Sequence, residues 1–95
     1  MDRPAGLDGD WQVIRTGGLL PPLVGVRKRI RGERGWTSLG PLPGVPFDVA
    51  GSELRYRPPL RGLVDVVEPD DGGFAGRSLL FGRELGTFRL VRRRG

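Results

Sequence analysis

Cysteine and histidine are both absent from the 95 residues, and each absence removes several classes of function. Without cysteine there is no disulfide framework, no thiolate metal site and no cysteine nucleophile. Without histidine there is no imidazole metal site, no histidine-ligated haem and no serine–histidine catalytic pair. A carboxylate site for Mg²⁺ or Ca²⁺ stays open, but Asp70-Asp71-Gly72-Gly73 lacks the spacing of a calcium-binding loop. We therefore expect no metal and no cofactor, and we interpret residues 70–73 as a turn.

Long apolar runs and lysine are also scarce. No run approaches the ~20 residues that cross a bilayer, and Met1-Asp2-Arg3-Pro4 has no apolar core like that of a signal peptide. We therefore expect a soluble cytoplasmic protein that does not bind a membrane. Among the 16 basic residues Lys28 is the one lysine, and the formal net charge is +5. Arginine, glycine and proline share GC-rich codons, so the arginine content alone does not identify an acidic partner.

Glycine and proline are abundant, with 17 and 9 residues, which favours many turns and argues against long helices. The length predicts a single domain over residues 1–95, with residues 1–8 as a loose lead-in. Between the turns, short alternating runs predict eight strands: 10–16, 24–31, 36–40, 45–49, 53–57, 63–67, 74–81 and 84–92.

Eight short strands in a meander predict an all-β, antiparallel, up-and-down barrel whose interior holds side chains or one small ligand. A five- or six-stranded Greek-key barrel is the alternative. In residues 24–31 the alternation places Val24, Val26, Lys28 and Ile30 inward and the arginines outward. In the last hairpin, with a turn around Gly82-Arg83, we expect Leu79, Phe88 and Leu90 inward; a longer loop through Gly86 would shift this register. The apolar loop of residues 19–23 is expected to cap a barrel end or to form a dimer contact.

Gly9-Asp10-Trp11 resembles the Gly-x-Trp signature that opens the first strand of lipocalin-like barrels. In that family the tryptophan lies at the closed end and packs against an arginine from the last strand. The resemblance therefore implies that Trp11 meets Arg92, or Arg89, with the guanidinium on the indole face. This chain is much shorter than ordinary lipocalins and lacks their flanking helix and disulfides, so the resemblance implies a shape and at most a pocket.

The leading functional hypothesis is a non-enzymatic barrel that binds a small apolar or acidic molecule, or that is purely structural with an interior filled by its own side chains. Lys28 on an apolar face must be paired, neutral or used. It either reaches the barrel mouth, pairs with Asp65 or Asp48, or anchors an acidic head group. Arg15 shares the face of Trp11 and is a second inward cation in this hypothesis. The expected ligand-binding residues are Arg15, Val26, Lys28, Phe47, Tyr56, Asp65 and Phe88.

Two alternatives remain open. A basic barrel could bind single-stranded nucleic acid through Arg27, Arg29 and Arg31, with Trp36 and Tyr56 as stacking platforms. A solvated arginine face that protects strand edges explains the same pattern. An isomerase or cyclase would need an inward acid or base. The inward candidates for that role are Asp65, Asp48, Glu84, Tyr56 and Lys28, and no spacing among them selects a reaction.

Overall fold

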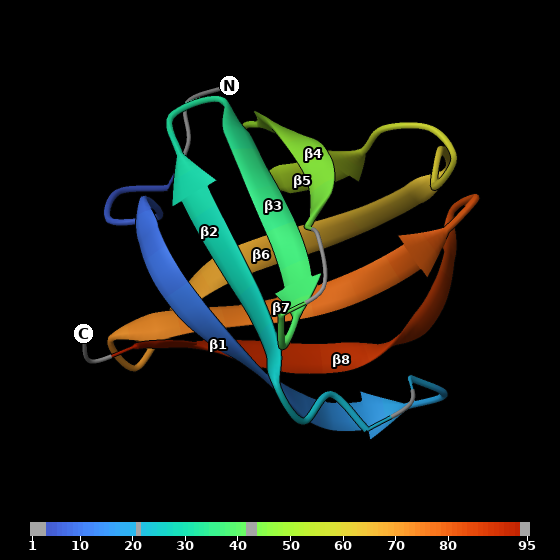
Figure 1. The fold of residues 1–95 in the computed structure, drawn as a ribbon. Helices are drawn as coiled ribbons and strands as arrows, with labels where there is room; N and C mark the ends of the chain where they lie inside the picture. The colour runs from blue at the N-terminus through green and yellow to red at the C-terminus, as the bar shows by residue number, and fades with distance from the viewer. Residues whose placement is uncertain (1–3, 21, 42–43, 94–95) are drawn as a thin grey trace.

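In the computed structural model, which describes residues 4–20, 22–41 and 44–93, the chain forms a closed barrel. Each strand pairs with the next, and the last returns to the first (Figure 1). The strands are β1 (Gly9–Gly18), β2 (Val26–Arg31), β3 (Arg34–Leu39), β4 (Val45–Ala50), β5 (Glu53–Tyr56), β6 (Leu63–Asp70), β7 (Gly73–Leu80) and β8 (Arg83–Arg92). The predicted all-β meander is confirmed. No helix long and apolar enough to cross a membrane occurs in these described ranges.

Barrel closure depends on the ladder between the two ends of the chain. Trp11 pairs with Arg92, Val13 with Leu90, and Gly18 with Gly86. The amide of Arg93 also donates to the carbonyl oxygen of Asp10 at 2.9 Å. A closed sheet has no free outer strands, so the short chain buries a core without a covering layer.

Two hairpins turn on two-residue loops in which both residues have positive φ. Asp71 and Gly72 have φ of 46° and 77°, and Phe81 and Gly82 have 48° and 82°. Such turns match the right-handed twist of the flanking strands. The expected turn at residues 70–73 is confirmed.

The second of these turns corrects the expected register of the last hairpin. It lies at Phe81-Gly82, so Leu80 pairs with Arg83, and a bulge follows between Ser78 and Leu79. Phe88 and Leu90 point inward as expected, but the expected inward placement of Leu79 is wrong. The buried residues of β7 are Gly73, Phe74, Gly76 and Ser78, and Leu79 is half-buried.

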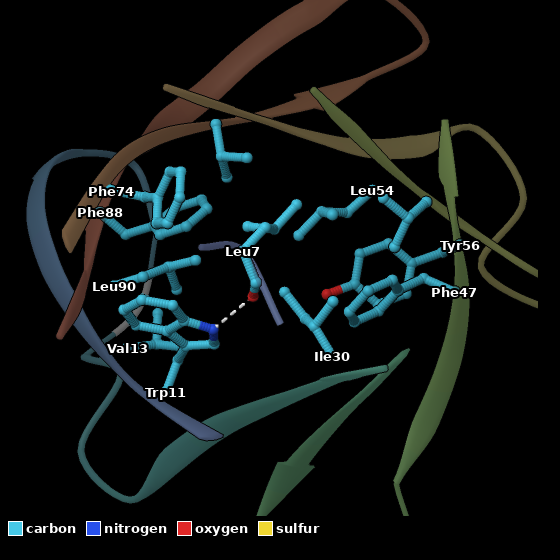
Figure 2. Packing of buried hydrophobic residues seen from close by; sticks show 12 residues of the cluster. Leu7, Trp11, Val13, Ile30, Phe47, Leu54, Tyr56, Phe74, Phe88 and Leu90 are labelled. Carbon is cyan, nitrogen blue, oxygen red and sulfur yellow. Dashed lines mark hydrogen bonds between the residues drawn. The ribbon is translucent and has the colours of Figure 1, made fainter. Parts of the chain in front are cut away.

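The interior is filled by side chains. Gly35 pairs with Phe47, and Gly76 pairs with Phe88, across neighbouring strands. A methyl group at either glycine would overlap the facing ring, so each phenylalanine occupies the space that its partner leaves. The buried apolar cluster contains Leu7, Trp11, Val13, Ile30, Phe47, Val49, Leu54, Tyr56, Val67, Phe74, Phe88 and Leu90 (Figure 2).

The closed end is sealed by the segment before β1. Leu7 is 2 % exposed, and its carbonyl oxygen accepts a 2.8 Å hydrogen bond from Nε1 of Trp11 (Figure 2). Residues 1–8 were expected to be a loose lead-in, and residues 1–3 lie outside the described residues. The part from residue 4 instead contributes a core side chain, because the indole N–H needs a partner when it is buried.

The opposite end is the loop end, where the even-numbered strands begin and the odd-numbered strands stop. Val26, Val45 and Leu63, the first residues of β2, β4 and β6, are partly buried there and pack on the core. From the loop of residues 19–23, Leu20 and Leu23 also pack on the core, as predicted for a cap, whereas Leu19 is exposed and Pro21 lies outside the described residues. Val24 was expected inward, and this is wrong: it precedes β2 and is 87 % exposed.

Candidate functional site

A polar network lies inside the barrel, centred on Lys28 of β2. Its Nζ lies 2.7 Å from Oγ1 of Thr37, 2.5 Å from Oη of Tyr56 and 2.9 Å from Oδ2 of Asp65. An ammonium group has three N–H donors, and each has a partner here. Both charged side chains of the pair are nearly inaccessible, at 3 % exposure for lysine and 4 % for aspartate.

The remaining polar atoms of the network are also satisfied. Oγ of Ser78 donates to Oδ1 of Asp65 at 2.7 Å, and the hydroxyls of Thr37 and Tyr56 lie 2.6 Å apart. Among the described residues no buried side-chain nitrogen or oxygen lacks a hydrogen-bond partner. A buried ion pair is tolerated when its geometry is good and its other lone pairs are used. This network meets both conditions.

Burial and charge oppose each other at Lys28. Desolvation lowers the pKa of the ammonium, but the oxygens of Tyr56 and Asp65 outweigh it, so the pKa of Lys28 stays above its ordinary value. Burial likewise raises the pKa of the Tyr56 phenol, against the opposing attraction of the lysine. The lysine is therefore a cation held in place. It is not a neutral amine available as a base.

The rings predicted to line the interior surround this cation. Nζ of Lys28 lies 5.4 Å from the ring centroid of Phe47, 5.2 Å from that of Tyr56 and 5.7 Å from that of Phe88. Five of the seven predicted ligand-binding residues therefore meet at one place: Lys28, Phe47, Tyr56, Asp65 and Phe88. Val26 lies nearer the loop end than these five residues, at the start of β2, and is partly buried.

Arg15 is the exception. It was expected to be a second inward cation, and this is wrong. Its side chain is exposed, and the guanidinium donates to the carbonyl oxygens of Leu20, at 2.7 Å, and Gly18. Strand parity placed the residue on the right face, but its position near the end of β1 puts it beyond the filled interior.

Thr37 and Ser78 belong to the network and were not identified from the sequence. Each is the cross-strand partner of a charged member: Thr37 pairs with Lys28, and Ser78 pairs with Asp65. Polar residues on an inner strand face were the available signal. Only the register makes them neighbours of the charges.

The acids proposed for catalysis separate into two groups. Asp65 is inside, whereas Asp48 and Glu84 were wrongly expected inward. Asp48 binds Arg57 on the outer surface through a 2.8 Å contact, and Glu84 is exposed near Arg77. Within the described ranges no group of three or more acidic side chains is placed to hold a metal ion.

The predicted closure pair is confirmed. The guanidinium carbon of Arg92 lies 4.3 Å from the centroid of the Trp11 ring, and Nη2 donates to the carbonyl oxygen of Gly6 at 2.9 Å. Arg89 lies elsewhere and binds Asp70. The arginine thus covers the indole and ties down the segment that carries Leu7.

A second site lies on the outer surface of β1–β3, in a hollow of about 360 Å³. We call it the basic hollow, defined by Arg27, Arg29, Trp36 and Arg93, with Asp10, Lys28, Ser38 and Gly44 also lining it. Trp36 is 41 % exposed as a residue, and Arg29 is its cross-strand partner. The expectation that Tyr56 is a second stacking platform on this surface is wrong, because its ring is inside the barrel. Arg94 lies outside the described residues.

The charges of the basic hollow are partly paired. Asp10 accepts hydrogen bonds from Arg29 at 3.1 Å and from Arg31 at 3.2 Å. The Arg29 bond is the largest influence on this carboxyl and, together with the smaller effect of Arg31, holds its pKa below the usual value. The guanidinium of Arg27 donates to the carbonyl oxygen of Gly40 at 3.2 Å, and this hydrogen bond holds the side chain in place. Arginines outnumber the single carboxylate, so the hollow is cationic.

Comparison with family models, with curated proteins and with solved structures found no match to this chain. The barrel and its Trp11–Arg92 closure agree with the shape that the lipocalin-like resemblance implies. Membership of that family stays a prediction.

Proposed function

We propose that this protein binds single-stranded nucleic acid in the basic hollow, on the outside of a barrel whose interior is structural. The observation that carries the proposal is an exposed indole, Trp36, set among arginines in a concave site. Single-strand binders combine aromatic faces, on which bases stack, with a basic surface that follows the phosphates. Both parts are present on adjacent strands.

The spacing on the sheet suits one nucleotide. Trp36 and Arg29 are directly opposite each other on β3 and β2, where side chains stand about 5 Å apart. Arg27 lies two residues before Arg29 on the same face of β2. A base on the indole therefore leaves its neighbouring phosphates within reach of both guanidinium groups.

Interior binding, which the lipocalin-like resemblance would imply, is less well supported. An acidic ligand would need a donor from Lys28, and Thr37, Tyr56 and Asp65 use all three. An apolar ligand would have to displace the rings that fill the barrel. We assign the network to stability.

The test is fluorescence anisotropy of a labelled oligothymidylate of about ten nucleotides, within the site size of such modules. Three or so phosphate contacts predict that log K falls with log salt at a slope near −2. Trp36→Ala should weaken binding about tenfold, the effect of losing one stacked base. Arg27→Gln with Arg29→Gln should weaken binding and flatten the salt slope.

Arg55→Gln with Arg77→Gln is the matched control. Both arginines are exposed, at 60 % and 56 %, on other strands, and the double change removes the same charge. The control should retain binding. Equal loss in the control, or binding unaffected by Trp36→Ala, would mean that net charge alone attracts the oligonucleotide and would overturn the proposal.

A further inference from the structure

Asp10 supplies the carboxylate of the basic hollow, and its hydrogen bonds use only one of its two oxygens. It accepts from Nε of Arg29 at 3.1 Å and from Nη2 of Arg31 at 3.2 Å, and both bonds end on Oδ1. Within residues 4–20, 22–41 and 44–93, no hydrogen bond to Oδ2 is formed. The side chain is 42 % exposed, so Oδ2 is open to a ligand in the hollow.

The outer faces of three adjacent strands bring this carboxylate and the exposed indole into one row. Asp10 on β1 pairs with Arg29 on β2, and Arg29 pairs with Trp36 on β3 (Figure 1). Two strand spacings, about 10 Å, separate the two ends of the row. Asp10 and Trp36 line the same hollow. A base stacked on the indole with one edge toward β1 therefore faces the carboxylate.

A carboxylate at this position does not suit a phosphate. The hydrogen bond from Arg29, with the smaller effect of Arg31, holds the pKa of Asp10 below its usual value. The group is therefore ionised at neutral pH, where it accepts hydrogen bonds and cannot donate them. It repels a phosphate and attracts the N–H groups of a ligand. In a nucleic acid the bases carry such groups on their edges.

The bases differ in the donors of their pairing edges. Guanine presents N1–H and the N2 amino group side by side, whereas cytosine and adenine each present one amino group. Thymine and uracil place their single N–H between two carbonyl oxygens, which a carboxylate repels. Two adjacent donors without a carbonyl between them give guanine the best match to an ionised acceptor.

We propose that the basic hollow prefers guanine, with N1–H and the N2 amino group of a base on Trp36 donating to Asp10. This inference rests on the proposed binding of single-stranded nucleic acid and adds a base preference to it. Arg29 can serve both parts of the site, because it holds Asp10 through Nε and its terminal nitrogens form no hydrogen bond in the described ranges. A complementary strand would cover the edge that Asp10 reads, so the preference applies to unpaired strands.

The test compares ten-nucleotide oligothymidylates that carry one guanine, cytosine or adenine at the centre, each competing with the labelled oligothymidylate. The guanine probe should bind about tenfold more tightly than the all-thymine probe, the scale of a base contact with two hydrogen bonds. Hypoxanthine lacks the N2 amino group and should lose part of this gain. 7-Deazaguanine keeps both donors and should retain it.

Asp10→Asn tests the carboxylate itself. The amide oxygen replaces Oδ1 as the acceptor for Arg29 and Arg31, so the NH₂ group takes the place of Oδ2 and meets the donors of guanine. The preference for guanine should fall to within about twofold. Affinity for the all-thymine probe should hold or rise, because a negative charge is removed. Asp48→Asn is the matched control, since it removes an exposed carboxylate that binds an arginine outside the hollow, and it should keep the full preference.

The outcomes separate this inference from the function on which it rests. Equal affinity for all four probes, with Trp36→Ala still weakening binding, would overturn the guanine preference and leave the proposed function in place. No binding of any probe would overturn both. A preference that survives Asp10→Asn would overturn the assignment to Asp10. A gain for RNA probes that is equal for every base and lost in Asp10→Asn would assign the carboxylate to the ribose 2′-hydroxyl and overturn the inference as well.

Discussion

Two ion pairs of this barrel have the same chemistry in opposite surroundings. Lys28 and Asp65 lie inside at 3 % and 4 % exposure, while Arg57 and Asp48 lie outside at 42 % and 50 %. The outer contact is 2.8 Å and the inner one 2.9 Å, so distance does not distinguish them. Water can replace a lost partner on the outside. Inside, a lost partner leaves an uncompensated charge among aromatic rings.

Arginine and lysine are divided between these two settings. The one lysine of the chain is the interior cation, while arginines cover the surface and close the barrel at Trp11. A compact ammonium group with three donors matches three oxygens in a filled interior, and a wide planar guanidinium does not. The comparison therefore predicts large effects for changes inside and small effects for changes outside.

The largest effect is expected from Asp65→Ala. It leaves the Lys28 charge buried with only two hydroxyl partners, and should lower the free energy of unfolding by about 3–5 kcal/mol. Lys28→Met combined with Asp65→Leu removes both charges and should recover at least half of the loss. Denaturant unfolding measures both. A double variant as unstable as the single one would show that the network provides more than charge compensation.

The next effect is a loss of stability at alkaline pH. The folded state raises the pKa of both Lys28 and Tyr56, so it holds these protons more tightly than the unfolded chain does. The stability from this difference is fully present below the unfolded pKa values of about 10. It is lost as the pH rises from there through the folded values.

The composition makes this experiment unusually specific. Lys28 is the only lysine, Tyr56 the only tyrosine, and the chain has no cysteine or histidine. Above neutral pH, titration therefore belongs to these two side chains and the terminal amine until arginine titrates. Denaturation midpoints from pH 8 to 11 should fall in the wild type and fall less in the Lys28→Met, Asp65→Leu variant. Tyrosinate absorbance would report Tyr56 directly, and ionisation at the ordinary pKa would contradict the network.

The sequence predicted which residues point into the barrel better than it predicted which of them contact one another. Alternation in β2 correctly turned Lys28 inward, because one face of that strand is apolar and the other is arginine. It left Asp65 and Asp48 as equal partners, since strand parity depends on bulges and turn lengths that no local pattern fixes. Thr37 and Ser78 were missed for the same reason, and Leu79 was misplaced by the bulge beside it.

The position of a side chain along the length of the barrel was harder to predict than the face of the strand on which it lies. Arg15 shares the parity of Trp11, yet it lies at the end of the barrel, where a side chain reaches the loop carbonyls. Val24 was counted with β2, although the pairing begins two residues later. Alternation reports which face a residue occupies; it carries no information about the length of the neighbouring strand. The sequence therefore gave no sign that the pairing of β1 with β2 covers only Gly9–Gln12.

Arg92 provides an intermediate case between inside and outside. Its guanidinium covers the buried Trp11 ring and donates to Gly6, yet the residue is exposed to water. Arg92→Gln should lower the free energy of unfolding by about 1 kcal/mol, the scale of an exposed cation–π contact. Arg93→Gln, the adjacent control, should change it less. Because Trp11 is buried and Trp36 is exposed, the blue-shifted part of the emission should move red only in the Arg92 variant.

The smallest effect is expected for Asp48→Asn. The hydrogen bond from Arg57 holds the pKa of Asp48 below its usual value, so this contribution is present above the ordinary pKa and fades as the pH falls below it. Both side chains are close to half exposed, where water and salt weaken the attraction. The denaturation midpoint at neutral pH should therefore move less than in Arg92→Gln, and the difference should vanish in high salt. A loss as large as that of Asp65→Ala, persisting in salt, would mean that the outer pair acts like the inner one, and burial would no longer explain why the chain places its one lysine inside.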